Sequence, residues 1–116
     1  MLESYRELHV WQRAMQLTVA IYRVSTGFPK EETFGLTSQL RRASVSIASN
    51  VAEGYGRNSQ GEYKHFLGIA RGSNLEVQTQ LFLAGELGYG NPEGLAKADQ
   101  LSNEVAKMLN AMINKF

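Results

Sequence analysis

The chain has 116 residues, of which 43% are hydrophobic and 20% are charged. This length and composition predict one globular domain, residues 1–116, with a single core. The absence of cysteine excludes disulfides and thiolate metal sites. No apolar run approaches the roughly 20 residues that a membrane-spanning helix requires, and charges interrupt the N-terminal segment where a secretory signal would be apolar. We therefore expect a cytoplasmic protein with no membrane partner.

The net charge is only +1, but the charges are unevenly placed. Five Arg or Lys and two Glu fall between positions 41 and 71, whereas three Lys and five acidic residues fall between positions 72 and 116. A basic middle can bind a polyanion, although a difference of this size also occurs on ordinary solvated surfaces.

The first helix is expected from Leu8 to Ser25, where apolar residues recur at helical intervals. Gly27 follows it, and the rigid Phe28-Pro29 pair supplies a break before the next element.

The second helix is expected from about residue 35 to Glu53. Its apolar residues recur every three or four positions: Leu36, Leu40, Ala43, Ile47 and Val51. We expect the Gly-Tyr-Gly sequence at 54–56 to stop this helix, since glycine readily adopts the left-handed conformation found just beyond many helix ends.

The third helix is expected to start at about Gln60, because Ser59 and Glu62 have the spacing of a capping box. Its apolar face continues to the glycine-rich turn at 88–92, and Pro92 opens a fourth helix that runs towards the C-terminus. No segment has the alternating pattern of a β-strand. Four long helices with short connections predict an all-α, antiparallel up-down-up-down four-helix bundle.

Some helices carry apolar residues beyond a single core-facing stripe. They are Leu8, Trp11, Met15 and Tyr22 in the first helix and Ile69 and Phe82 in the third. If they are not buried, they predict self-association; the alternative is that they widen the core. Gly68 and Gly72 lie four residues apart, which would let a neighbouring helix approach closely.

No pattern supports an enzyme or a metal centre. Glu62 and His65 match the Glu-x-x-His motif of di-iron bundles, but Arg6 stands where the second histidine, His9, would need its glutamate. No nucleophile, base and orienting group occur in the setting of a hydrolase. The glycines near 54–61 lack the Walker pattern of a phosphate-binding loop. We predict a non-enzymatic protein without a metal or a cofactor.

Four polar residues interrupt otherwise apolar helical stretches: Asn50, Glu53, Ser73 and Glu76. If the second and third helices are antiparallel, these side chains can meet across the bundle. Buried polar groups need partners, so we predict a structural network that fixes the helix register with the help of nearby arginines.

The remaining functional candidates are cations, because guanidinium groups in particular bind phosphate oxygens at two points. The candidates are Arg41, Arg42, Arg57, Lys64 and Arg71. Tyr55 and Tyr63 could stack on unpaired bases, as RNA recognition commonly requires. Each tyrosine could equally anchor a loop or belong to the core.

Three stretches carry a family resemblance: LHVWQRAMQL, FPKEETFGLTSQLRRASVSIASNVAEGYGR and FLGIARGSNLEVQTQL. From Tyr5 to about Leu87 the chain resembles the four-helix-bundle family named for proteins encoded in 23S ribosomal RNA intervening sequences. The resemblance implies a small bacterial bundle. Some members form pentameric rings, and a related accessory protein of diversity-generating retroelements binds nucleic acid on a basic surface. The positions that match characteristic family residues are Arg41, Arg42, Asn50, Glu53, Gly54, Arg57, Arg71, Gly72, Ser73 and Glu76.

Two hypotheses about function follow. In the first, a homo-oligomer, a pentamer by resemblance, binds ribosomal RNA or another nucleic acid through the five cations, and the binding weakens steeply with salt. In the second, a homo-oligomeric scaffold binds no nucleic acid and uses its arginines at subunit interfaces. Replacing Arg41 and Arg42 distinguishes them, because the first hypothesis predicts lost affinity and the second a broken oligomer.

Overall fold

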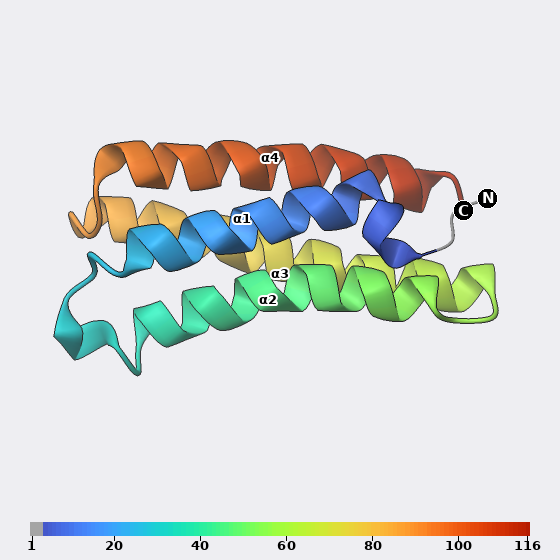
Figure 1. Cartoon of the computed structure of the whole chain (residues 1–116), viewed down its shortest axis with the longest axis horizontal. Helices are drawn as coiled ribbons and strands as arrows, with labels where there is room; N and C mark the ends of the chain where they lie inside the picture. The colour runs from blue at the N-terminus through green and yellow to red at the C-terminus, as the bar shows by residue number, and fades with distance from the viewer. Residues whose placement is uncertain (1–3) are drawn as a thin grey trace.

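The structure is a computed structural model of the chain and describes residues 4–116; the first three residues of the expected domain lie outside the described part. Four α-helices and two short 3-10 helices make up this part, and it contains no strand (Figure 1). The α-helices are α1 (His9–Ser25), α2 (Leu36–Tyr55), α3 (Gln60–Glu86) and α4 (Pro92–Asn114), and the 3-10 helices are η1 (Tyr5–Glu7) and η2 (Lys30–Glu32). The prediction of an all-α chain with four long helices is confirmed.

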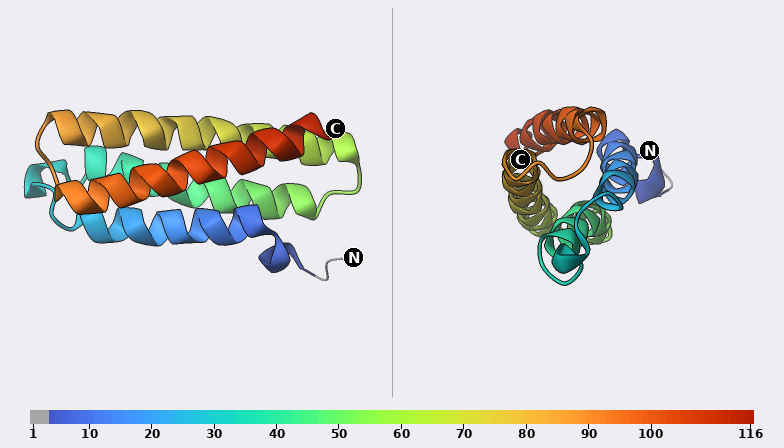
Figure 2. Two further views of the ribbon diagram at one scale, coloured as in Figure 1. Left: turned by 90° about the horizontal axis from the view of Figure 1, so that it is seen from above. Right: turned by 90° about the vertical axis from the view of Figure 1, so that its left-hand side faces the viewer.

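The helices form an elongated bundle of 43 × 24 × 22 Å in which each helix packs against the helices before and after it, and α4 closes the ring against α1. The end-on view in Figure 2 shows this square arrangement, with α1 diagonally opposite α3 and α2 diagonally opposite α4. Successive helices run in opposite directions, so the predicted up-down-up-down topology is confirmed. The diagonal placement means that the outward sides of α1 and α3 face away from each other.

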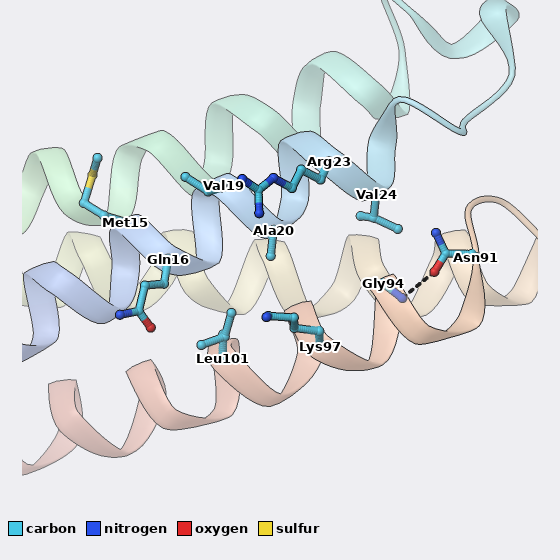
Figure 3. Close-up of a pocket in the computed structure, with 10 residues that line it drawn as sticks. All are labelled: Met15, Gln16, Val19, Ala20, Arg23, Val24, Asn91, Gly94, Lys97 and Leu101. Carbon is cyan, nitrogen blue, oxygen red and sulfur yellow. Dashed lines mark hydrogen bonds between the residues drawn. The ribbon is translucent and has the colours of Figure 1, made fainter.

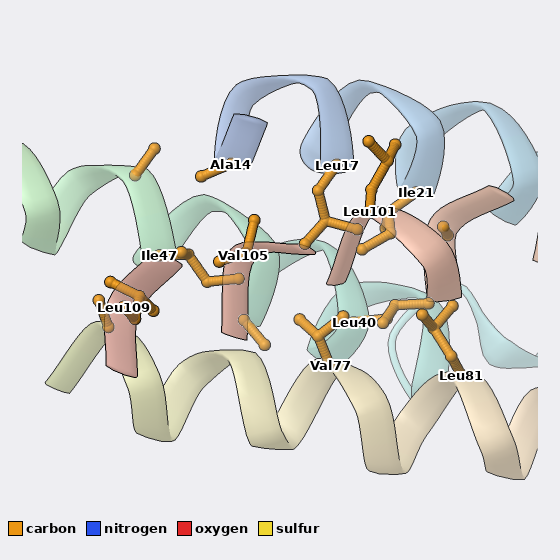
Figure 4. Close-up of a cluster of buried hydrophobic side chains, with 14 of the residues drawn as sticks. Ala14, Leu17, Ile21, Leu40, Ile47, Val77, Leu81, Leu101, Val105 and Leu109 are labelled. Carbon is orange, nitrogen blue, oxygen red and sulfur yellow. The ribbon is translucent and has the colours of Figure 1, made fainter. Parts of the chain in front are cut away.

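The core lies on the bundle axis and is built from the predicted stripes (Figure 4). Each fully buried Leu or Ile side chain contributes roughly 1.5–3 kcal/mol relative to an exposed one. The largest apolar side chains that are almost completely buried are Leu17, Ile21, Leu40, Ile47, Leu67, Leu109, Val51, Val77 and Val105.

Of the six apolar residues outside the core-facing stripes, some are partly buried and widen the core, and the others remain exposed. Leu8 and Trp11 are partly buried and pack against the core, so they widen it. The other four, Met15, Tyr22, Ile69 and Phe82, stay exposed on the outside of α1 and α3.

Helix starts agree with the capping signals in the sequence. Ser59 Oγ accepts a hydrogen bond of 3.1 Å from the Glu62 amide and begins α3 at Gln60 as predicted. Asn91 does the same for the Gly94 amide at 2.6 Å, immediately before Pro92 opens α4. A complete capping box at Ser4 and Glu7, which the sequence analysis missed, begins η1.

Helix α2 ends within the predicted Gly-Tyr-Gly sequence, but the left-handed conformation expected there is wrong. The helix continues to Tyr55, and Gly56 has a right-handed φ of −78°. The left-handed glycines are instead Gly88 and Gly90, with φ of 73° and 74°, in the turn between α3 and α4. That turn must reverse the chain within a few residues, and glycine alone adopts positive φ at little cost.

The prediction that another helix of this bundle packs closely against Gly68 and Gly72 is also wrong. A Cβ at either position would meet no atom within 4 Å, because both face outward from α3. The close approach occurs at Gly54, where a Cβ would lie 2.9 Å from Phe66 Cβ and 3.2 Å from the Tyr63 carbonyl oxygen. The small residue is therefore needed on α2, not on α3.

The connection between α1 and α2 is held in place by side chains. Phe28 is buried beside Tyr89, with ring centroids 5.7 Å apart. Glu32 accepts hydrogen bonds from the Leu36 amide at 3.0 Å and from the Tyr89 hydroxyl at 3.1 Å. Glu32 thus caps α2 and ties it to the α3–α4 turn, while Phe34 is left 96% exposed.

Candidate interaction surfaces

Arg41 packs onto the end of α1 and does not point freely into solvent. Its Nε donates to Ser25 Oγ at 2.8 Å, its Nη2 donates to the Tyr22 carbonyl at 3.3 Å, and its guanidinium lies 4.6 Å from the Tyr22 ring centroid. The last turn of a helix presents unpaired carbonyls and the negative end of the helix dipole, which favour a cation there. The position of Arg41 is thus explained by the docking of α2 on α1.

Arg42 faces the other neighbour of α2. It lines a shallow hollow of about 340 Å³ between α2 and α3, together with Ser46, Ser73 and Glu76. Consecutive helical residues point about 100° apart, so the Arg41-Arg42 pair divides between the α1 side and the α3 side. Within residues 4–116, Arg42 has no hydrogen bond or ion pair.

The other three cations differ in what they contact. Arg57 forms an ion pair of 3.2 Å with Glu53, and its guanidinium lies 4.7 Å from the Phe66 ring centroid. Arg71 donates to Asn110 Oδ1 at 3.3 Å, across to α4. Lys64 is exposed on α3. The structure spreads the five cations over three sides of the bundle and does not gather them into one cluster.

Two of the four predicted network residues meet through a residue that the sequence analysis missed, Ser46. Asn50 Nδ2 donates to the Ser46 carbonyl at 2.8 Å and to Ser46 Oγ at 2.9 Å, and Ser73 Oγ donates to Ser46 Oγ at 2.9 Å. Glu53 lies apart with Arg57, and Glu76 borders the hollow beside Arg42. The i, i+4 spacing of Ser46 and Asn50 was the available signal.

The two tyrosines considered for base stacking contact each other. Their rings meet edge to face at 6.2 Å, and Tyr63 also packs on Phe116 at 5.4 Å. The pKa of Tyr63 is raised above its ordinary value of 10.0, mainly because the side chain is partly buried and to a lesser extent because Tyr55 lies nearby. Tyr63 thus packs where α2, α3 and the C-terminus meet.

A groove between α1 and α4, here called the α1–α4 groove, is lined largely by apolar side chains. It encloses about 550 Å³, and Figure 3 shows Ala20 and Leu101 pointing towards each other across it. Arg23 and Lys97 bring positive charge to its rim. The lining residues are Met15, Gln16, Val19, Ala20, Arg23, Val24, Asn91, Gly94, Lys97 and Leu101.

A second apolar surface, here called the α3 outer face, runs along the C-terminal half of α3. Phe82 is 71% exposed and Leu75 is 55% exposed, and Leu83 is also exposed. Glu86 lies on the same side one turn after Phe82, and a hollow beside Phe82 also includes Asp99 of α4. This surface is therefore apolar with negative charge at its border.

Neither surface contains a metal site or a membrane span. Over the described residues, no three His, Asp or Glu side chains are placed to hold a metal ion. In the same part of the chain, no helix combines the length and apolar character needed to cross a bilayer.

Comparison with known proteins gives one family. Residues 6–111 match the model of the family described as 23S rRNA-intervening sequence protein. The chain belongs to this family. The resemblance stated from the sequence is confirmed, and the match includes most of the last helix, for which the sequence motifs had given only a pattern.

The fold is also found in a crystal structure. A protein of unknown function from the S23 ribosomal protein family of Bacteroides thetaiotaomicron superposes with a TM-score of 0.82 at 23% identity, over 90% of this chain and 97% of that one. No curated protein sequence is detectably similar to the chain. The family assignment therefore establishes the bundle and leaves the biochemical role to the surfaces.

Proposed function

We propose that the chain is a non-enzymatic helical bundle that works as a homo-oligomer. The observation that carries this proposal is the exposure of large apolar side chains on two helices that lie diagonally across the bundle. Apolar patches on a small soluble domain commonly mark protein contacts. The cytoplasm is the compartment that we expect for it.

On α1 the exposed residues Met15, Val19 and Tyr22 are four and three positions apart and so form one line. On α3 the line includes Leu75, Phe82 and Leu83. The core is complete without either line, because the axis of the bundle is already filled. A second copy is the simplest partner that could cover both lines, and the family resemblance favours a pentameric ring.

Light scattering coupled to gel filtration tests this proposal. Within loading concentrations of roughly 1–100 µM the mass should rise to a plateau at a fixed multiple of 12.9 kDa, since assembly follows mass action. A monomer throughout this range would overturn the proposal.

A second candidate function, nucleic-acid binding, is supported by the cations that the fold does not use. Arg42 and Lys64 have no ion pair or hydrogen-bond partner among residues 4–116. Arg57 and Arg71 are exposed and could exchange their weak contacts for phosphate. A ring of subunits would repeat these cations, and partners would be ribosomal RNA or another single-stranded nucleic acid.

Fluorescence anisotropy with labelled ribosomal RNA fragments and single-stranded DNA tests the second candidate. Arg42→Ala/Lys64→Ala should weaken binding and lower the salt-dependence slope by about two units if each cation contacts one phosphate. Lys107→Ala/Lys115→Ala removes the same charge from α4 and the residue that follows it and should leave binding nearly unchanged. Equal losses in both variants, or no binding at low salt, would exclude specific phosphate contacts at Arg42 and Lys64.

A further inference from the structure

We propose that the α1–α4 groove of one copy receives the α3 outer face of the next copy, so that subunits join head to tail through two different surfaces. This inference rests on the proposed self-assembly and adds which surfaces meet. The occupant of the groove is thus a second copy of this chain, with Phe82 as the residue that enters it.

The two surfaces have the positions that a closed ring requires. They lie on different sides of the bundle, because the groove lies between α1 and α4, whereas the α3 outer face lies on the helix diagonally opposite α1, with Phe82 on the side towards α4. They also lie near the same end, which contains the C-terminal halves of α1 and α3 and the N-terminal half of α4 (Figures 1 and 2). A contact between different surfaces at one height closes into a ring when the rotation allows, whereas surfaces at different heights would build a filament.

The charges of the two surfaces are complementary. Helix α1 contains no acidic residue, and Arg23 and Lys97 at the groove have no carboxylate partner within the described chain. Two carboxylates lie in the hollow beside the groove: Glu104 is already paired with Arg13, and Glu93, one turn before Lys97, forms no ion pair with it. The C-terminal half of α3 contains no cation, and Glu86 is the carboxylate beside Phe82, since Glu76 borders the hollow beside Arg42. Opposite charges across the contact favour this pairing.

The same charges disfavour symmetric pairing of like surfaces. Two grooves facing each other would place Arg23 and Lys97 against their own copies, and two α3 outer faces would oppose Glu86 to itself. Like charges brought together at an interface are costly. The charges therefore favour a contact between the groove of one copy and the α3 outer face of another.

The shape of the groove also fits the Phe82 side chain that projects from the α3 outer face. The groove encloses about 550 Å³ and is lined by Val19, Ala20, Val24 and Leu101, so it has room and apolar walls for an aromatic ring. Phe82 projects into solvent, and the glycine three residues later, Gly85, would meet nothing within 4 Å even with a Cβ added. A helix can therefore approach α3 closely beside Phe82. An aromatic side chain in an apolar pocket is typical of a binding hot spot.

Because the chain lacks cysteine, thiol crosslinking can identify the contact. Val19→Cys places a thiol in the groove, and Thr79→Cys places one at the centre of the α3 outer face without removing Phe82. Each single variant and an equimolar mixture of the two are treated with a short bis-maleimide and run on denaturing gels. The mixture of Val45→Cys with Thr79→Cys is the control, since Val45 on α2 is 43% exposed, close to the 44% of Val19.

The expected result is a covalent dimer in the mixture of Val19→Cys and Thr79→Cys, at about ten times the yield of the control mixture or of either variant alone. In Val19→Cys/Thr79→Cys the same reaction should give a ladder whose longest product contains all subunits of the ring. Dimers of either single variant would indicate a symmetric contact and overturn the inference. A mixture that reacts no more than the control would also overturn it.

Light scattering on the unmodified protein separates this failure from failure of the proposed function. If the protein is oligomeric but positions 19 and 79 do not crosslink, only the head-to-tail contact is wrong. If the protein is monomeric, both proposals fail. Circular dichroism melting of the three single variants should match the parent chain, because all three positions are solvent-exposed.

Discussion

Ser102 and Asn74 form a reciprocal hydrogen-bonded pair in the centre of the bundle. Ser102 Oγ donates to Asn74 Oδ1 at 2.8 Å, and Asn74 Nδ2 donates to the Ser102 carbonyl at 3.0 Å. Both residues are almost completely buried. The pair joins α3 to α4 at one fixed register, because sliding either helix would leave polar atoms unpaired in the core.

The first prediction is that Ser102→Ala destabilises the protein by about 1–3 kcal/mol, because Asn74 Oδ1 loses its donor in an apolar environment. Urea unfolding measures the change. Ser49→Ala, an exposed serine on α2, should stay within about 0.5 kcal/mol of the parent chain. Asn74→Leu/Ser102→Ala should cost less than the two single changes combined, since no unpaired polar side chain remains. Equal stability of Ser102→Ala and Ser49→Ala would mean that the pair does not hold the register.

The second prediction concerns Gly54, which allows α2 and α3 to approach closely. Helix propensity alone predicts that Gly54→Ala gains up to about 1 kcal/mol. The structure predicts a net loss of roughly 1–3 kcal/mol, because the new Cβ would press on the backbone of α3 at Tyr63 and on Phe66. Gly68→Ala, in open space on α3, should gain about 0.5–1 kcal/mol. A gain for Gly54→Ala in the same urea experiment would contradict the packing described.

The third prediction separates Arg41 from Arg42. Arg41→Ala removes the contacts with Ser25 and Tyr22 and should cost about 1–2 kcal/mol, whereas Arg42→Ala should change stability by less than about 0.5 kcal/mol. Thermal unfolding by circular dichroism measures both. The reverse order would mean that Arg41 does not dock α2 on α1. In the nucleic-acid experiment, single changes are therefore more informative than the double change suggested by the sequence.

The fourth prediction is a loss of stability at alkaline pH. The hydrogen bond to Glu32 raises the pKa of Tyr89, and burial raises the pKa of Tyr63, in both cases above the ordinary value of 10.0. The folded protein therefore holds both protons more tightly than the unfolded chain does. This contribution is fully present below about pH 10 and is lost as the pH rises through the raised values. Urea midpoints above about pH 10 should fall less in Tyr63→Phe and Tyr89→Phe than in the parent chain; identical pH profiles would exclude the effect.

The fold could be predicted because its signals are local. The apolar periodicity of each helix, the cap at Ser59 and the Asn91-Pro92 start depend on residues within one or two turns of each other. The stop at 54–56 was predicted correctly, but not its right-handed conformation, and the close contact of Gly54 with α3 was missed because no local pattern reveals it.

The candidate surfaces were only partly predictable. The sequence identified the five cations and the exposed Met15, Tyr22, Ile69 and Phe82, but it missed the exposed Val19, Leu75 and Leu83. It could not separate Arg41, held by α1, from Arg42, which faces α3, because adjacent cations look alike until the neighbouring helices are placed. Ser46 and the Asn74–Ser102 pair escaped notice because their partners are 27 and 28 residues away.

The sequence by itself thus determined the family, the number of helices, the order in which they alternate and the composition of the core. These follow from periodicity and capping, which act within a helix. Only the tertiary structure decided which glycine brings helices together, which arginine is used for packing, and which apolar residues remain on opposite sides of the bundle. Those outcomes depend on the rotation of each helix against its neighbours, which packing of the whole core sets.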